Sequence, residues 1–313
     1  MHLRIMEACQ SEDRTVDNKL KRGSLEMIAA MLISGTIGWF VLASGQAVVD
    51  VVFWRCLIGG AALLLVCAVL GLLRAELLGR RVLLLAVLSG VAIVGNWLLL
   101  FASYAQASIA VSTVVYNVQP FMLVGLAALF LGERITWLKL GWLALAFIGM
   151  LAIVGAHGRG AVAGGNYLLG IALALGAALL YAVAALIVKR LSATPPHLIA
   201  LIQLLTGVLM LAPLAGHQLP QGEAAWASLM TLGVVHTGLM YMLLYGAIQK
   251  LPTALTGALS FIYPVAAILV DWLAFDHWLS PLQWLGVAAI LLAAAGMQQG
   301  WRFGLRARPT VRA

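Results

Sequence analysis

The sequence predicts an all-α polytopic membrane protein with ten transmembrane helices, arranged as two inverted five-helix repeats. Three observations carry this prediction: the composition, the spacing of long apolar segments, and the distribution of basic residues. Hydrophobic residues make up 63% of the 313 residues and charged residues only 10%, whereas soluble domains contain roughly 25% charged residues. Together with a mean hydropathy of +1.03, this composition excludes an ordinary soluble protein.

Apolar segments of roughly 20 residues are needed to cross about 30 Å of hydrocarbon. The expected spans are 25–44, 48–71, 82–103, 107–131, 137–156, 166–188, 197–215, 225–248, 253–274 and 281–299. They divide the chain into a cytosolic polar tail at 1–24, a first repeat at 25–156, a second repeat at 166–299 and a cytosolic basic tail at 300–313. The first 24 residues lack the apolar core and cleavage site of a signal peptide, so we expect an irregular polar tail.

Lys and Arg residues test the number of spans, because they concentrate in the cytosolic loops of membrane proteins. Of the 19 basic residues, 17 fall in the two tails or in connections that follow even-numbered spans. The alternate connections hold only Arg159, and Arg55 lies inside the second span. This distribution predicts a multi-pass protein of the cytoplasmic (inner) membrane with both termini in the cytosol. It also explains the net charge of +8, so we expect no nucleic-acid partner.

Two apolar stretches with a central proline occupy matching places in the two halves. A shift of 144 residues lays Pro120 on Pro264, and the same shift lays Gln119 on Tyr263. Because each half has an odd number of spans, the second half enters the membrane from the opposite side, as in the inverted repeats of secondary transporters.

The residues around the two prolines resemble a known family. "YNVQPFMLVGLAALFLGERIT" and "GWLALAFIGMLAIV" resemble the end of a repeat unit in the EamA branch of the drug/metabolite transporter superfamily, and residues 245–297 resemble the end of the second unit. "GTIGWFVLASG" and "FWRCLIGGAALLL" are similar to the opening helices of that family. The resemblance covers about residues 25–299. It implies alternating access and a central cavity lined by spans 1, 3, 4, 6, 8 and 9.

The polar residues of spans 4 and 9 are the first candidates for a binding site. Ser108, Ser112, Tyr116 and Gln119 form one helical stripe, which Thr256, Ser260 and Tyr263 repeat in span 9. Each unpartnered polar group would be costly in lipid, so both stripes should face protein or a wet cavity. Pro120 and Pro264 should leave the carbonyls of Tyr116 and Ser260 without helical donors, and a ligand could use those carbonyls. The alternative is that each proline is only a packing kink.

Further candidates lie in other spans. We predict substrate contacts for His236 and Tyr241 in span 8 and for Asn96 in span 3, and we assign Asn117 to helix packing. His236 would sense protons or bind a carboxylate, or else serve as a neutral interhelical donor. Trp39 is either a cavity wall or an interfacial aromatic residue, and Tyr181 is either a ligand contact or a core residue.

Arg55 and Asp271 fall at comparable depth in spans 2 and 9, roughly 10 Å below the outer surface at 1.5 Å per residue. Opposite charges inside a membrane are usually paired, so we predict a charge pair that opens and closes with an outward gate. Separate snorkelling of the two side chains is the alternative. At the turn after span 4, "LGERIT" corresponds to "FDHWLS", so Glu133 lies opposite His277 and no shared role is expected.

The sequence shows no motif for ATP use and no cluster of catalytic residues. The chain has no Gly-x-x-x-x-Gly-Lys motif, so transport would run on a gradient or downhill. The acidic residues are scattered, which argues against a membrane enzyme. Cys56 and Cys67 share no metal or redox spacing with Cys9, so we expect packing roles, no bound metal and no cofactor.

We therefore predict a secondary transporter that exports a small amino-acid-like or related polar metabolite, where export and cargo class are implied by the resemblance. A metallophore would also suit the lining of tyrosines, amides and hydroxyls. The alternative is an importer or exchanger of another small metabolite, such as a nucleotide sugar or vitamin. The expected partners are the solute and the lipid bilayer, and both a monomer and a homodimer are open.

Overall fold

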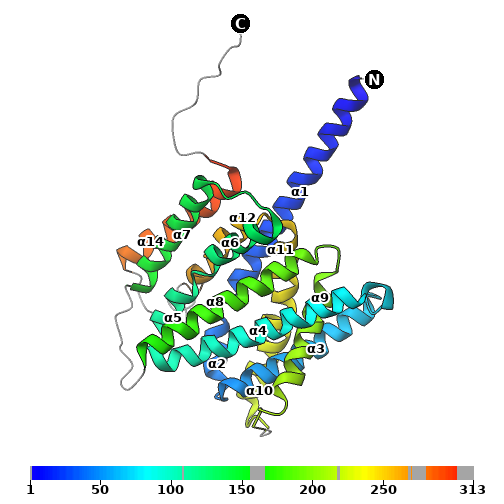
Figure 1. The fold of residues 1–313 in the computed structure, drawn as a ribbon. Helices are drawn as coiled ribbons and strands as arrows, with labels where there is room; N and C mark the ends of the chain where they lie inside the picture. The colour runs from blue at the N-terminus through cyan, green and yellow to red at the C-terminus, as the bar shows by residue number, and fades with distance from the viewer. Residues whose placement is uncertain are drawn as a thin grey trace.

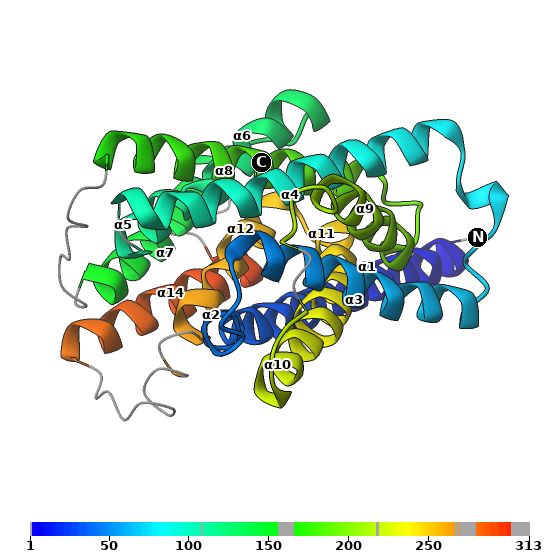
Figure 2. The same ribbon diagram turned by 90° about the horizontal axis from the view of Figure 1, so that it is seen from below.

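The protein is a bundle of helices that run back and forth along one common direction, as the computed structural model in Figure 1 shows. The structure describes residues 2–107, 109–155, 166–216, 219–266, 269 and 280–301. Every regular element within these ranges is a helix, which confirms the all-α fold class. The view from below shows the long helices lying side by side along that direction (Figure 2).

The elements follow one another with short connections. In chain order they are α1 (His2–Ser34), α2 (Ile37–Ala43), α3 (Val48–Val69), η1 (Ala75–Leu77), α4 (Arg80–Ala107), α5 (Ile109–Tyr116), α6 (Gln119–Leu131), α7 (Trp137–Gly155), α8 (Tyr167–Arg190), α9 (Pro196–Leu211), α10 (Glu223–Gly233), η2 (Val234–Leu239), α11 (Met240–Lys250), α12 (Thr253–Ser260) and α14 (Pro281–Gln299). The element η2 is a π-helix, and residues 262–266 are again helical after a break at Phe261.

Among the described residues, six helices are long and apolar enough to cross a membrane. They are Asp17–Val41, Val48–Val69, Arg80–Ser103, Tyr167–Arg190, Glu223–Lys250 and Pro281–Gln299. Four shorter apolar helices coincide with the other predicted spans: Gln119–Leu131, Trp137–Ile153, Pro196–Leu211 and Thr253–Ala266. The protein is therefore a multi-pass membrane protein, and the number of ten spans stays a prediction.

Helices from the two halves of the chain pack against one another. The helix α4 lies along α8 and α9, α1 along α11, and α7 along α14, as Figure 1 also shows for α7 and α14. The last pair touches through backbone, because a Cβ at Gly149 would lie 2.7 Å from the Gly286 carbonyl oxygen. Small residues permit such close approach of membrane helices. Cys56 and Cys67 are buried free thiols, in agreement with their predicted packing role.

The N-terminal tail is helical, so the prediction of an irregular tail at 1–24 was wrong. The helix α1 begins at His2, and its first part projects beyond the other helices (Figure 1). Pairs of opposite charge one turn apart support the helix: Lys21 lies 2.5 Å from Asp17, and Arg22 lies 3.1 Å from Glu26. Each such pair stabilises an exposed helix by roughly 0.3 kcal/mol, a local effect that the search for apolar segments did not count.

Spans 1, 4, 8 and 9 are not continuous α-helices, although each was predicted as one segment. Span 1 is interrupted at 35–36, span 4 at 117–118 and span 9 at Phe261, and span 8 contains η2. The interruptions at 117 and 261 are 144 residues apart, each three residues before a proline of the repeat. A proline has no N–H to donate, so the helix ends before it and begins again.

Candidate functional site

A small cavity lies where α6, α8 and α12 meet. It is lined by Gln119, Pro120, Leu123, Tyr181, Thr256, Gly257 and Ser260, and we call it the proline cavity. Its volume of about 10 Å³ is close to what one water molecule needs. The structure therefore brings together Gln119, Pro120, Tyr181 and Ser260, four of the residues predicted for substrate binding, and it places Thr256 of the second stripe beside them.

Gly257 brings the two proline-bearing spans into contact. A Cβ at Gly257 would lie 3.0 Å from Pro120 Cβ and 3.2 Å from Leu143 Cδ2, so only glycine allows this approach without displacement of a neighbour. On the same helix the Ser260 hydroxyl donates to the Gly257 carbonyl at 2.6 Å. Proline and glycine together thus hold α6 and α12 against each other.

Gln119 contributes an unbonded oxygen atom to the cavity. Its side chain is buried, and within the described part of the chain its Oε1 atom makes no hydrogen bond. Ser112 Oγ, two members back along the predicted stripe, is likewise buried and unbonded among the described residues. Leaving a buried acceptor unsatisfied costs about 1–3 kcal/mol, so the Gln119 oxygen is suited to accept a hydrogen bond from water or a solute. Ser108 lies outside the described residues.

Asn96 and Tyr116 lie behind one wall of the cavity. Asn96 Nδ2 donates to the Ala177 carbonyl at 2.8 Å and to the Tyr116 hydroxyl at 3.3 Å. The Tyr116 ring meets the Tyr181 ring edge to face, with 6.3 Å between centroids. Asn96 thus fastens α4 to α8 and positions Tyr116 against a tyrosine that lines the cavity. Asn117, in the interruption after α5, donates to the Thr113 carbonyl at 2.7 Å, and its role in helix packing stays a prediction.

A second polar region surrounds η2. Arg55 of α3 is only 2% exposed, and its Nε donates to Thr237 Oγ1 at 3.1 Å. Its guanidinium carbon lies 4.8 Å from the centre of the Trp97 ring, a cation–π geometry. In the ranges that the structure describes, no carboxylate forms an ion pair with Arg55. Asp271 lies outside those ranges, so the pair of Arg55 with Asp271 stays a prediction.

His236 of η2 is buried between α10 and the junction of α1 with α2. Its Nε2 lies 2.6 Å from Thr36 Oγ1, and its Nδ1 lies 3.2 Å from the Thr231 carbonyl oxygen. The Phe40 ring packs against the His236 ring in a tilted arrangement, with 5.0 Å between ring centroids. Trp39, which precedes Phe40 in the chain, is 48% exposed. This exposure favours the interfacial role over that of a cavity wall.

A buried network that was not predicted from the sequence joins α4, α9 and α11. The Tyr245 hydroxyl donates to Gln203 Oε1, and Gln203 Nε2 donates to Ser89 Oγ. A sequence signal existed, because Gln203 is an isolated amide in an apolar span, where such groups usually find partners. Tyr241, predicted for substrate binding, packs on Tyr245 at 5.2 Å and on Trp97 at 5.8 Å.

Tyr263 and Pro264 were also predicted for substrate binding. Tyr263 is half-buried and packs against the hydrophobic core, and Pro264 is buried. Neither lines the proline cavity.

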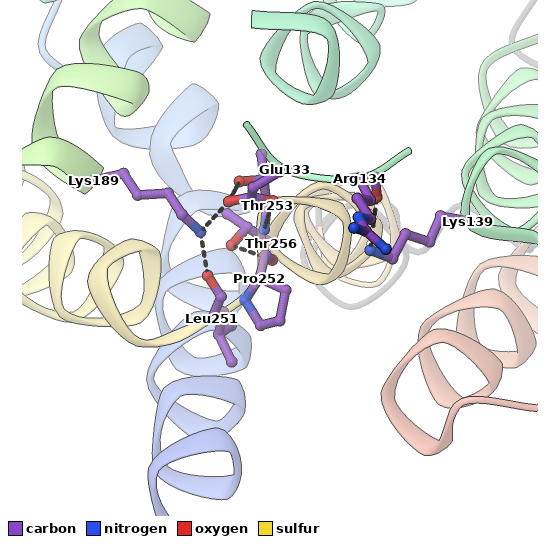
Figure 3. Close-up of polar contacts among 8 residues, drawn as sticks. All are labelled: Glu133, Arg134, Lys139, Lys189, Leu251, Pro252, Thr253 and Thr256. Carbon is purple, nitrogen blue, oxygen red and sulfur yellow. Dashed lines mark hydrogen bonds and ion pairs between the residues drawn. The ribbon is translucent and has the colours of Figure 1, made fainter. Parts of the chain in front are cut away.

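Glu133 joins the two repeats at one end of the bundle. We call this end the basic end, because it holds Arg134, Lys139, Lys189 and Lys250. Glu133 Oε1 accepts from the Thr253 hydroxyl at 2.6 Å and lies 3.1 Å from Lys189 Nζ. Lys189 also donates to the Leu251 carbonyl at 2.6 Å. Figure 3 shows these side chains converging from the loop after α6, the end of α8 and the start of α12. We call Glu133, Lys189 and Thr253 the Glu133 cluster.

The carboxylate of Glu133 also caps α12, since the Thr253 backbone N–H donates to its Oε2 at 3.3 Å. An anion is stabilised at the positive end of a helix dipole. Burial raises the pKa of Glu133, but the hydrogen bonds from Thr253 and the charge of Lys189 outweigh burial and bring this pKa below its ordinary value. His277, which the repeat places opposite Glu133, lies outside the described residues.

Comparison with known proteins agrees with this architecture. The model of the EamA-like transporter family matches residues 21–155 and again residues 168–298, so the family unit occurs twice. The chain is 27% identical to the "Uncharacterized transporter YxxF" of Bacillus subtilis (strain 168), over 91% of this chain and 92% of that protein. A solved crystal structure matches the fold with a TM-score of 0.76 and 20% identity, over 87% of this chain and 95% of the other.

Proposed function

The chain belongs to the EamA-like transporter family, and on that premise we propose that it exports a small amino-acid-like or related polar metabolite across the cytoplasmic membrane by alternating access. The observation that carries this proposal is the proline cavity, where the proline-bearing spans of both repeats meet around the unbonded Gln119 oxygen. In transporters built from inverted repeats, the substrate site lies at the interface of the repeats near the membrane midplane.

The chemistry of the lining supports the proposed class of solute. The cavity offers an amide, hydroxyls, a phenol ring and apolar surface, and none of its lining residues is charged. A phosphate or nucleotide sugar would call for Lys or Arg at the site. Neutral hydrogen-bonding groups suit a zwitterionic or aromatic solute instead, and a metallophore of amino-acid type falls in the same class.

The size of the cavity supports a cycle with an occluded state. Space for about one water molecule is far too small for a metabolite, so the helices around it must separate before a solute enters. The proline interruptions at 117 and 261 offer places where α6 and α12 could bend without breaking regular hydrogen bonds.

The Glu133 cluster would be the closure at the basic end, which the distribution of Lys and Arg assigns to the cytosol. Its carboxylate comes from the first repeat, whereas Lys189 and Thr253 come from the second. Opening the cavity toward that side would pull α12 away from the loop after α6. The same step would break both contacts of Glu133.

The proposal is tested by untargeted metabolomics of cells and medium, compared between a strain that lacks the gene and strains that overexpress it. A metabolite that accumulates inside the deletion strain and outside the overexpressing strain names the solute. Gln119→Leu should abolish this redistribution, because it replaces the unbonded amide with an apolar group of similar size. Gln221→Leu, in the exposed loop before α10, is the matched control and should export normally. Accumulation in the opposite compartments would establish an importer.

A further inference from the structure

Two irregular stretches of backbone meet at His236. Span 1 is interrupted between α1 and α2, at residues 35–36, and η2 interrupts span 8 as a π-helix. The contact between them is that of Thr36 with His236, two residues that are 200 positions apart in the chain. Discontinuous helices carry ion sites in many transporters, and π-turns are frequent at functional sites.

The hydrogen bonds of His236 define where its protons lie. Nδ1 lies 3.2 Å from the Thr231 carbonyl oxygen, and because a carbonyl only accepts, Nδ1 must carry hydrogen to bond there. Nε2 faces Thr36 Oγ1 at 2.6 Å. A hydroxyl both donates and accepts, so this second contact can form whether or not Nε2 carries a proton.

Rotation of the Thr36 hydroxyl allows it to bond His236 in both protonation states of the ring. When His236 is neutral, the Thr36 hydroxyl donates to Nε2. When His236 is protonated, Nε2–H donates to Thr36 Oγ1, and the hydroxyl hydrogen turns to the Ile33 carbonyl, which lies 2.8 Å away. That carbonyl also accepts from the Thr36 backbone N–H at 3.1 Å, so it keeps a donor in either state.

From this geometry we propose that His236 and Thr36 form a proton-binding site that couples export of the solute to the proton gradient. The inference rests on the transport function proposed above. A proton from outside binds at Nε2 and leaves to the cytosol when the protein has opened to the other side. The proton moves inward in exchange for the solute, which moves outward.

The charged and titratable groups around the site are consistent with reversible binding. The helix α3 contributes Arg55, whose guanidinium is bound to Thr237, the neighbour of His236. The segment α2 contributes the Phe40 ring, α10 the Thr231 carbonyl, and α11 the buried Tyr241. Within the described residues no carboxylate forms an ion pair with His236 or Arg55. The positive charge of Arg55 therefore opposes a second positive charge, so that a bound proton is not trapped.

The proton site is tested without any solute, by histidine ¹⁵N NMR of the full chain in lipid nanodiscs between pH 4.5 and 9. His236→Gln identifies the signal, and the remaining histidine signals verify that each variant is folded. We expect the ring of His236 to titrate reversibly. Thr36→Val should shift its midpoint by about one pH unit, because the charged form loses a charge-assisted hydrogen bond. Thr36→Ser keeps the hydroxyl and should titrate as the wild type does.

Two results would overturn the proton site: a His236 ring that does not titrate in this range, or a Thr36→Val variant that titrates as the wild type does. Coupling has a separate readout in cells, where export is measured with and without a protonophore. Wild-type export should fall when the gradient collapses, while the residual export of His236→Gln should not respond. An equal response of both proteins would refute coupling. If the wild type exports nothing, the transport proposal fails, while the NMR titration still decides the proton site.

Discussion

The proline cavity and the region around η2 are both built at breaks in membrane helices, but they differ in charge and in symmetry. The cavity is uncharged, and its two proline-bearing spans are related by the repeat of 144 residues. The η2 region holds Arg55 and His236, which lie on spans 2 and 8. The spans that the repeat relates thus contribute an uncharged lining. Arg55 and His236, which the repeat does not relate, contribute a charged and a titratable side chain.

The two regions also keep their broken helices stable in different ways. Pro120 and Pro264 have no backbone N–H, so a hydrogen-bond donor is absent there whatever the surrounding side chains are. In η2 every N–H is present, but side chains bond the carbonyls five residues earlier: His236 Nδ1 to Thr231, and the Thr237 hydroxyl to Leu232 at 2.6 Å. A π-turn that depends on its own side chains should be more sensitive to point mutation than a break imposed by proline.

The largest expected effect on transport is that of Gly257→Leu in the proline cavity. The new side chain would occupy the space between Pro120 and Leu143, where even a Cβ is 3.0 Å from its neighbour. Overpacking of this kind costs about 1–3 kcal/mol, equivalent to about 5- to 150-fold in an equilibrium. Export of the solute should fall accordingly. Gly125→Leu on α6 is the control, because a Cβ there meets nothing within 4 Å, and normal export by both variants would contradict the site.

Arg55→Met tests the difference in charge between the two regions, because it removes the positive charge of Arg55 and makes the η2 region as neutral as the proline cavity. Replacing a buried ion pair by apolar side chains of similar volume is often neutral or stabilising, by about 1–4 kcal/mol, and within the described residues Arg55 has no carboxylate partner that its loss would leave unpaired. We therefore expect a higher melting temperature in detergent, together with loss of export.

The same measurement decides the predicted pair with Asp271. If that pair exists, Arg55→Met leaves a carboxylate unpaired and lowers the melting temperature. The double variant Arg55→Asp with Asp271→Arg would then melt above either single variant. A double variant no better than the singles would remove support for the pair.

Tyr245→Phe should have an intermediate effect, confined to stability. It removes the donor to Gln203 Oε1 and leaves a buried acceptor without that bond, at a cost of about 1–3 kcal/mol. Thermal unfolding of the purified protein should register the loss. Tyr167→Phe, at the exposed start of α8, is the matched control, and equal melting temperatures for the two variants would show that the network contributes little.

Glu133→Gln should have the smallest effect, and one that depends on pH. The folded-state pKa of Glu133 lies below its ordinary value, so its stabilisation is complete above the ordinary pKa and is lost as pH falls through the lowered value. At neutral pH the variant should lose about 0.5–1 kcal/mol, as expected for a partly exposed ion pair. The difference in melting temperature between the variant and the wild type should disappear at acidic pH. Glu76→Gln, exposed in η1, should show no such dependence.

Sequence reasoning succeeded where a local rule applied. Pro120 and Pro264 predicted lost backbone hydrogen bonds in two spans that were each expected as one segment, and the structure interrupts both, at 117 and 261. Gln119 and Ser260, which were selected because a polar stripe is costly in lipid, line one cavity. It failed at Thr36 and Thr231, since neither is distinctive in an apolar helix until His236 is brought beside it. The π-helix itself had no sequence signal, because no proline or glycine pair marks residues 234–239 as a break.

The sequence alone determined that this chain lies in a membrane, that its spans repeat after 144 residues, and where prolines interrupt them. These properties depend on the hydrophobicity and covalent structure of neighbouring residues. Only the tertiary structure decided that Thr36 meets His236 and that Glu133 caps α12 through Thr253, contacts between residues 200 and 120 positions apart. Such pairings are decided by how helices pack, and no local rule specifies which side chains face each other across an interface.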